Sequence, residues 1–199
     1  MATRLPAAER RDQLLAQALT VFAEQGFHAT SMNDVAEAAG VTKPVLYQHF
    51  TSKRVLYREL LADVGDQLRE IIVKATANAK SPHQQVEQGM IAYLAWVAAD
   101  SAGFRLLFGG GARRDEEFAR DVRAVEASIA EAIAELITAD VEPAHRLVLA
   151  HGILGLAEGS LRHLVGTNTM LDTEVFDTEV LGRQLADLAW AGLRGIRRV

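Results

Sequence analysis

The sequence has no cysteine among its 199 residues, only four prolines, and 6% aromatic residues. Without cysteine the chain has no disulfides, iron–sulfur clusters, thiolate zinc sites or cysteine nucleophiles. The longest apolar run, Met90 to Ala99, is far shorter than the roughly 20 residues that span a bilayer. The opening stretch MATRLPAAERR also lacks the apolar region of a signal peptide. We therefore expect a cytoplasmic protein with no membrane partner.

A basic excess, which is typical of nucleic-acid-binding proteins, is also missing from the chain as a whole. Its 21 Lys and Arg and 26 Asp and Glu give a net charge of −5. The first 60 residues nevertheless carry seven basic and six acidic side chains, so the negative charge is concentrated in the remainder. The composition therefore leaves a nucleic-acid partner possible for the N-terminal part.

Residue patterns for catalysis or metal binding are missing as well. The six histidines form no HxxxH pair or other ligand-spaced cluster, so we predict no metal site. The serines, histidines and aspartates include neither a nucleophile-elbow motif nor a defined carboxylate pair. Three glycines before Arg113 and Arg114 lack the Gly-Lys-Ser/Thr ending of a phosphate-binding loop, which favours a flexible connection. We predict no enzymatic activity and no cofactor.

Helical periodicity dominates the patterns that are present. The first apolar stripe is ended by Gly26 and consists of Leu14, Leu15, Ala18, Leu19 and Phe22. Further helices are expected over 32–39, 43–49, 53–79, 82–97, 115–137, 143–165 and 173–197, with a short apolar segment at 104–108 and a polar loop at 166–172. No alternating strand pattern of convincing length appears. We predict an all-α fold of about nine helices, with an N-terminal domain over 1–55 and a C-terminal domain over 56–199.

Two of the expected helices have helix-turn-helix spacing within residues 31–50. Gly40 between them can adopt the positive φ that a sharp turn needs. If Leu46 and Phe50 are buried, a 100° step per residue gives the second helix an exposed face of Pro44, Val45, Tyr47 and Gln48. A DNA major groove suits such a face because it offers thymine methyls to apolar groups and adenine edges to glutamine. An ordinary helical hairpin in a bundle core is the alternative.

The stretch from Phe22 to Leu60 resembles the TetR/AcrR family of bacterial one-component transcription regulators. The shared pattern is an aromatic plus Gly, Thr-Ser, an apolar-Ala pair, Ala-Gly-Val-Thr, Leu-Tyr-x-His-Phe and x-x-Lys. The resemblance implies a nine-helix homodimer whose first three helices bind a palindromic double-stranded DNA operator. It assigns base or groove contacts to Asn33, Thr42, Lys43, Pro44, Val45 and Gln48, and phosphate contacts to Ser31, Tyr47, His49 and Lys53.

The middle third of the chain holds five of the twelve aromatic residues. The family resemblance favours an effector cavity there, lined by Met90, Tyr93, Trp96, Phe104, Phe108 and His151, although ordinary core positions are the alternative. Residues 100–137 are loosely similar to actinobacterial family members that sense fatty acyl-CoA. The expected effector is therefore a small apolar molecule, with long acyl chains ranked first.

A stripe of small residues marks the helix expected over 143–165. Gly152, Gly155 and Gly159 fall on one face, and each glycine costs roughly 0.8 to 1 kcal/mol relative to alanine in a helix interior. Such a stripe indicates close helix packing. Together with a stripe of Leu181, Leu185 and Leu188 on the last helix, the resemblance favours a four-helix interface between two chains, whereas packing within one chain is the alternative.

The leading hypothesis is a ligand-responsive DNA-binding regulator, specifically a repressor that a small apolar effector releases from DNA. A helical ligand-binding or adaptor protein without DNA function is one alternative. An all-α enzyme that uses the same cavity is another. The exposed Tyr47 and Lys53 argue against the adaptor, and the missing catalytic motif argues against the enzyme.

Overall fold

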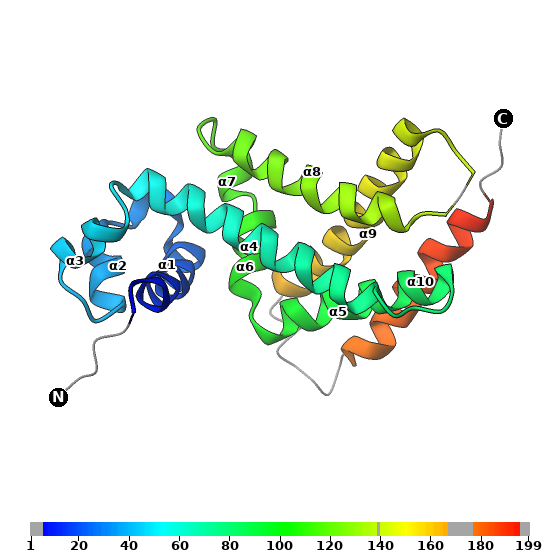
Figure 1. The fold of residues 1–199 in the computed structure, drawn as a ribbon, viewed down its shortest axis with the longest axis horizontal. Helices are drawn as coiled ribbons and strands as arrows, with labels where there is room; N and C mark the ends of the chain where they lie inside the picture. The colour runs from blue at the N-terminus through cyan, green and yellow to red at the C-terminus, as the bar shows by residue number, and fades with distance from the viewer. Residues whose placement is uncertain (1–5, 139, 167–176, 196–199) are drawn as a thin grey trace. The chain divides into compact units, whose positions relative to one another are not determined.

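The computed structural model describes residues 6–138, 140–166 and 177–195, and these contain helices and loops without any strand. The all-α prediction is therefore confirmed (Figure 1). The ten helices are α1 (Ala7–Ala29), α2 (Met32–Ala38), α3 (Lys43–His49), α4 (Lys53–Thr76), α5 (Pro82–Ala99), α6 (Ser101–Phe108), α7 (Gly111–Arg114), α8 (Ala119–Leu136), α9 (Pro143–Gly166) and α10 (Thr178–Gly195).

Most helix ends follow local signals in the sequence. Gly26 interrupts α1 with a φ of 78°, and Gly40 separates α2 from α3 with a φ of 63°. Both values lie in the left-handed region that glycine adopts at little cost. The Ser81 hydroxyl accepts a hydrogen bond from Gln84 N at 3.2 Å and caps α5.

Some helix boundaries differ from the prediction. The glycine-rich stretch after Phe108, predicted as a flexible connection, includes the single turn α7, which accounts for the tenth helix. α8 begins at Ala119 because Asp115 Oδ1 accepts a hydrogen bond from Glu117 N at 2.9 Å, which stabilises a turn before the helix. Asp177 Oδ1 accepts from Glu179 N at 2.8 Å and caps α10. The predicted start of α10 at 173 and most of the predicted loop at 166–172 lie outside the described residues.

The chain forms two compact units. Unit 1 comprises residues 1–64 and Ala102–Val122, and unit 2 comprises residues 65–101 and 123–199. α4 continues from unit 1 into unit 2 after Val64, and α8 does so after Val122. The predicted N-terminal domain, 1–55, therefore covers only part of unit 1.

The core of unit 1 includes a cluster of aromatic rings from distant parts of the sequence. The Phe118 ring centroid lies 4.5 Å from that of Phe27 and 4.7 Å from that of Tyr57. Phe22 packs edge-on against Tyr57 at 4.9 Å. Phe118 is fully buried, so the segment Ala102–Val122 completes a core that α1 and α4 begin.

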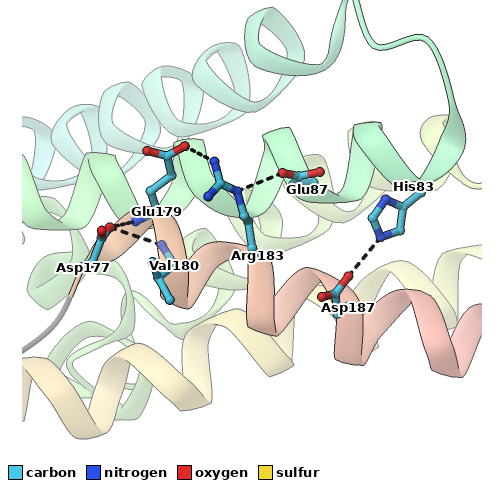
Figure 2. Close-up of polar contacts among 7 residues, drawn as sticks. All are labelled: His83, Glu87, Asp177, Glu179, Val180, Arg183 and Asp187. Carbon is cyan, nitrogen blue, oxygen red and sulfur yellow. Dashed lines mark hydrogen bonds and ion pairs between the residues drawn. The ribbon is translucent and has the colours of Figure 1, made fainter.

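In unit 2, α5 and α10 lie side by side. A Cβ atom at Gly182 of α10 would come within 2.8 Å of Ile91 Cγ1 and 3.0 Å of Ile91 Cα, so only glycine allows this approach. Figure 2 shows two polar links across the same pair of helices. Arg183 Nε donates to Glu87 Oε1 at 3.3 Å, and His83 Nε2 lies 3.0 Å from Asp187 Oδ1.

No single helix in the described part of the chain is long and apolar enough to cross a membrane. In the same described part, Pro82–Ala99 and Ser101–Arg114 reach the required length and composition only when they are taken together as a bent pair.

Candidate functional sites

α2 begins with a capping box that fixes its first turn. The Ser31 hydroxyl accepts hydrogen bonds from Asn33 N and Asp34 N, each at 3.2 Å, and Asp34 Oδ2 accepts from Ser31 N at 2.7 Å. The hydrogen bonds from the Ser31 main chain and hydroxyl lower the pKa of Asp34, and the nearby Lys53 charge adds to this effect. The ionised carboxylate therefore stabilises the entry into the helix-turn-helix.

α3 presents an exposed face opposite a fully buried edge. Leu46 and Phe50 have no exposed surface, which agrees with the prediction from their spacing. The Tyr47 side chain is 42% exposed. Two of the other predicted contact residues, Val45 and His49, are half-buried. The exposed ones are Ser31, Asn33, Thr42, Lys43, Pro44 and Gln48.

Thr42 occupies the residue before α3, and its side chain makes no capping hydrogen bond. Its backbone is extended, with φ −80° and ψ 150°, and Pro44 occupies the first turn. The hydroxyl therefore does not cap α3. It lies on the exposed side of the helix-turn-helix.

Lys53 has hydrogen-bond partners within the protein. Its Nζ donates to Phe27 O at 2.8 Å and to Thr30 O at 2.7 Å, and it lies 4.3 Å from the Phe27 ring centroid. The phosphate contact of Lys53 stays a prediction. Sequence reasoning missed these partners because a lysine in the first turn of a helix usually extends into solvent.

Several arginines near the helix-turn-helix form ion pairs within unit 1. Arg54 pairs with Glu117, and Arg58 Nε lies 3.0 Å from Asp121 Oδ2. Arg11 pairs with Glu59, and its guanidinium lies 5.1 Å from the Phe50 ring centroid. Sequence reasoning missed these pairs because their partners are far apart along the chain.

A cavity of about 170 Å³ lies within unit 2. Its wall includes no charged side chain among the residues that the structure assigns to it. Thr76 contributes a hydroxyl that donates to Ile72 O at 2.9 Å, so this polar group is satisfied within its own helix. The lining residues are Ile72, Thr76, Pro82, Gln85, Val86, Gly89, Met90, Tyr93, Ile133, Leu136, Ile137, Thr138, Ile153, Leu154, Ala157, Trp190 and Leu193.

Of the six residues predicted for an effector cavity, Met90 and Tyr93 line this one. The other four do not. Phe104 and Phe108 are buried in unit 1, at 1% and 0% exposure, because α6 belongs to that core. Trp96 contacts the Tyr93 ring from outside the wall, and His151 is exposed on α9. The aliphatic lining residues of α8 and α9 were missed, because their helical spacing is that of ordinary core residues.

The glycine stripe of α9 is open in the described part of the chain. A Cβ atom added at Gly152, Gly155 or Gly159 would meet nothing within 4 Å. Larger apolar residues on α9 and α10 are also exposed, with Val148 at 68% and Leu188 at 61%. Leu181 and Leu185 are half-buried. Packing among the described residues of one chain therefore does not account for these glycines.

Comparison with known proteins adds independent findings. Residues 14–60 match the family model described as "Bacterial regulatory proteins, tetR family". The chain is 34% identical over 192 residues to the HTH-type transcriptional activator FasR of Mycolicibacterium smegmatis. This match covers 96% of this chain and 85% of that protein.

Solved structures share the whole fold. A TetR-like transcriptional regulator from Rhodococcus sp. RHA1 has a TM-score of 0.76 at 26% identity, covering 97% of this chain and 100% of that one. FadR from Bacillus subtilis, solved in complex with stearoyl-CoA, has a TM-score of 0.75 at 15% identity, covering 94% of this chain and 99% of that one. At that identity the second likeness concerns the fold alone.

Proposed function

The chain belongs to the TetR family of bacterial regulatory proteins, and we propose that it binds a palindromic DNA operator as a homodimer and responds to an apolar effector. The observation that carries this proposal is the exposed face of α3. Tyr47 and Gln48 extend from a seven-residue helix whose opposite edge, at Leu46, is fully buried. A major groove admits one helix and accommodates such a mixed polar and apolar face.

Each predicted contact residue of the helix-turn-helix has a chemical role in this proposal. Gln48 recognises an adenine edge through its amide, and the Pro44 and Val45 side chains contact thymine methyls. Asn33, Thr42 and Lys43 complete the base and groove contacts. Ser31, Tyr47, His49 and Lys53 contact phosphates, which position the protein without reading sequence.

Selection of bound duplexes from a random pool tests this function. We expect a palindromic consensus, because a two-fold dimer presents two equivalent α3 helices to two half-sites. The variant Gln48→Ala should relax preference at one or two base pairs by roughly 1 to 3 kcal/mol. The matched control Gln25→Ala, exposed on α1 but outside the motif, should leave the consensus unchanged. A lone protomer on a nonpalindromic site would contradict the proposal.

The dimer is proposed to form through α9 and α10. The open glycine stripe at Gly152, Gly155 and Gly159 allows close approach of a second backbone. Exposed Leu188 and half-buried Leu181 and Leu185 supply apolar surface beside it. Because a two-fold axis uses the same patch twice, two α9–α10 pairs would form a four-helix interface.

The cavity supports an effector whose buried part is apolar and uncharged. A carboxylate or phosphate inside it would lose hydration without gaining an opposite charge, which is costly. We propose a long acyl chain as the buried part, with a polar head group such as that of coenzyme A remaining outside. The B. subtilis FadR complex with stearoyl-CoA supports this choice by fold alone.

The size of the cavity adds a constraint on this effector. Its 170 Å³ is close to the roughly 150 Å³ of an engineered cavity that holds benzene. A long acyl chain therefore needs side chains around the cavity to move apart. Binding is in this way coupled to a change of conformation, which is what an effector requires.

Helix α4 supplies a route from the cavity to DNA. It contributes Ile72 and Thr76 to the cavity wall, and its first turns belong to unit 1. An effector that prefers one position of α4 thereby favours one separation of the two α3 helices in a dimer, and half-sites lie about 34 to 36 Å apart. By linkage, operator DNA must weaken effector binding by the same factor. Calorimetric titration of stearoyl-CoA with and without saturating operator tests this, with coenzyme A alone as the control.

Repression relieved by the effector is the form of control that we propose. Activation is a second candidate, since the relative matched along 96% of the chain is described as an activator. Transcription in vitro from a promoter that carries the selected operator separates the two. Repression predicts fewer transcripts when protein is added and recovery when effector follows.

A further inference from the structure

We infer that the cavity of unit 2 opens beside the start of α5, and that Gln85, just inside this opening, recognises a carbonyl group of the effector. The inference rests on the acyl effector proposed above and narrows its chemistry. The effector is then a compound whose long chain meets its head group at a carbonyl, such as a thioester. A plain alkyl chain with the same head group is a poorer ligand.

The residues that α5 contributes to the cavity wall become more buried along the helix. Pro82 is exposed and Gln85 is half-buried, whereas Met90 and Tyr93 are only 4% and 2% exposed. A helix rises about 1.5 Å per residue, so Tyr93 lies about 12 Å further along the helix axis than Gln85. The cavity is therefore closed toward Tyr93 and accessible toward Pro82.

The lining residues of α8 and α10 place the opening at the same end. Thr138, which follows α8, is exposed, and Trp190 and Leu193 near the end of α10 are half-buried. The His83 ring, next in sequence to Pro82, packs edge-on against Trp190 with 5.5 Å between the ring centroids. The end of α10 therefore lies beside the start of α5. We define the rim of the opening as Pro82, Thr138, Trp190 and Leu193.

Gln85 brings free hydrogen-bond donors to the boundary between this rim and the apolar interior. Its side-chain amide lines the cavity and makes no hydrogen bond with another described residue. The hydroxyl of Thr76 lies further in, where its Cγ2 is 3.4 Å from a Cβ position built on Gly89. That hydroxyl already donates to Ile72 O at 2.9 Å. An amide group has two N–H donors and one acceptor, so Gln85 can donate to a ligand oxygen.

An acyl compound places an oxygen at this boundary. When the long chain fills the cavity and the head group remains outside, the carbonyl that joins the two lies near the opening. A carbonyl removed from water needs a new donor, because a buried polar group without a partner is unfavourable. The Gln85 amide supplies that donor. An alkyl chain has no oxygen there and gains nothing from the amide.

The test compares stearoyl-CoA with S-octadecyl-CoA, a thioether that keeps the chain and the coenzyme A but lacks the carbonyl oxygen. Calorimetric titration of the full chain should give about fivefold tighter binding of stearoyl-CoA, the usual net effect of one hydrogen bond. Gln85→Leu should bind the two compounds equally. The matched control Gln88→Leu makes the same change on α5 outside the cavity wall, and it should keep the preference.

Two further variants separate hydrogen bonding from shape and from the direction of the chain. Gln85→Glu keeps the size of the side chain, but an ionised carboxylate only accepts hydrogen bonds, so the preference should reverse in favour of the thioether. Thr76→Val removes the hydroxyl further inside and should keep the wild-type preference. Thermal unfolding checks each variant, and Gln85→Glu carries the test if Gln85→Leu does not fold.

The outcomes separate this inference from the proposed effector. If the wild type binds both compounds equally, the acyl-chain effector stands and the carbonyl recognition is overturned. A preference that persists in Gln85→Leu also overturns it. A preference lost in Thr76→Val but kept in Gln85→Leu would place the carbonyl at the closed end of the cavity. If the wild type binds neither compound, the proposed effector itself is wrong, and the inference fails with it.

Discussion

His28 Nε2 lies 2.6 Å from Asp115 Oδ2, although 87 positions separate the two residues in sequence. The Arg54–Glu117 and Arg58–Asp121 pairs repeat this relationship along the same segment. Three basic side chains beside the helix-turn-helix are therefore paired with acidic residues from the second half of the sequence. The segment Ala102–Val122 is thus part of the structure that holds α1 and α4.

The two partners of the first pair should contribute unequally to stability. The His28 side chain is 81% exposed, so His28→Ala should change the free energy of unfolding by no more than about 0.5 kcal/mol. Asp115 also accepts from Glu117 N through Oδ1, so Asp115→Ala should cost about 1 kcal/mol, the usual net contribution of one hydrogen bond. Urea unfolding measures both. Equal effects of the two variants would contradict this prediction.

Phe118 should be essential for the fold of the N-terminal helices although it lies outside them. It is fully buried against Phe27 and Tyr57, so Phe118→Ala should cost about 3 to 5 kcal/mol. The midpoint temperature of thermal unfolding and the affinity for the operator should decrease together. Phe118→Leu is the milder control, because it fills most of the same space. A fragment of residues 1–64 lacks this ring, and cooperative unfolding of that fragment would contradict the prediction.

Gly155→Leu should separate the dimer without unfolding the protomer. A Cβ atom at Gly155 meets nothing within 4 Å in the described chain, so leucine has room on the isolated protomer. Across a two-fold axis it would add bulk twice, and overpacking costs about 1 to 3 kcal/mol per site. Light scattering measures the mass, and circular dichroism checks the fold. The graded control Gly155→Ala adds one methyl and should weaken the dimer less; an intact Gly155→Leu dimer would locate the interface elsewhere.

Ala157→Phe should close the cavity to an effector. Ala157 is 4% exposed and lines the cavity, so a phenyl ring there occupies space that a ligand would use. Stearoyl-CoA should then bind more weakly in calorimetry, while operator affinity is retained. In the wild type, binding should change the fluorescence of Trp190, which lines the cavity. Trp190→Phe should remove that signal and Trp96→Phe should keep it; the reverse would place the ligand elsewhere.

Asp34→Asn should remove part of the acid sensitivity of the fold. Hydrogen bonds from Ser31 lower the pKa of Asp34 below its usual 3.8. A carboxyl group with a lowered folded-state pKa stabilises the protein above its unfolded-state pKa, and this contribution is lost as pH falls through the folded-state value. The difference in stability between wild type and variant should therefore be constant at neutral pH and shrink below about pH 4. Urea unfolding as a function of pH measures this, and a difference independent of pH would refute it.

Local signals in the sequence predict much of the fold because they act within a few residues. Gly26 and Gly40 permit positive φ values, and the Ser31 and Ser81 caps satisfy main-chain donors next to them. The exposed face of α3 also follows from helical geometry once Leu46 is buried. The residues that line the cavity could not be predicted from local signals in this way. Aliphatic residues at helical spacing line a cavity or fill a core equally well, and only the neighbouring helices distinguish the two.

The sequence by itself determined the helices, the helix-turn-helix and the chemistry of its exposed face, since each depends on interactions between residues close along the chain. Tertiary structure decided where long-range partners meet. It gave Lys53 the carbonyls of Phe27 in α1 and of Thr30 after α1, and it placed Phe118 in the core of unit 1. It also put Phe104 in that core and Trp190 in the wall of the cavity. Such partners depend on how helices distant in sequence pack, which no local pattern specifies.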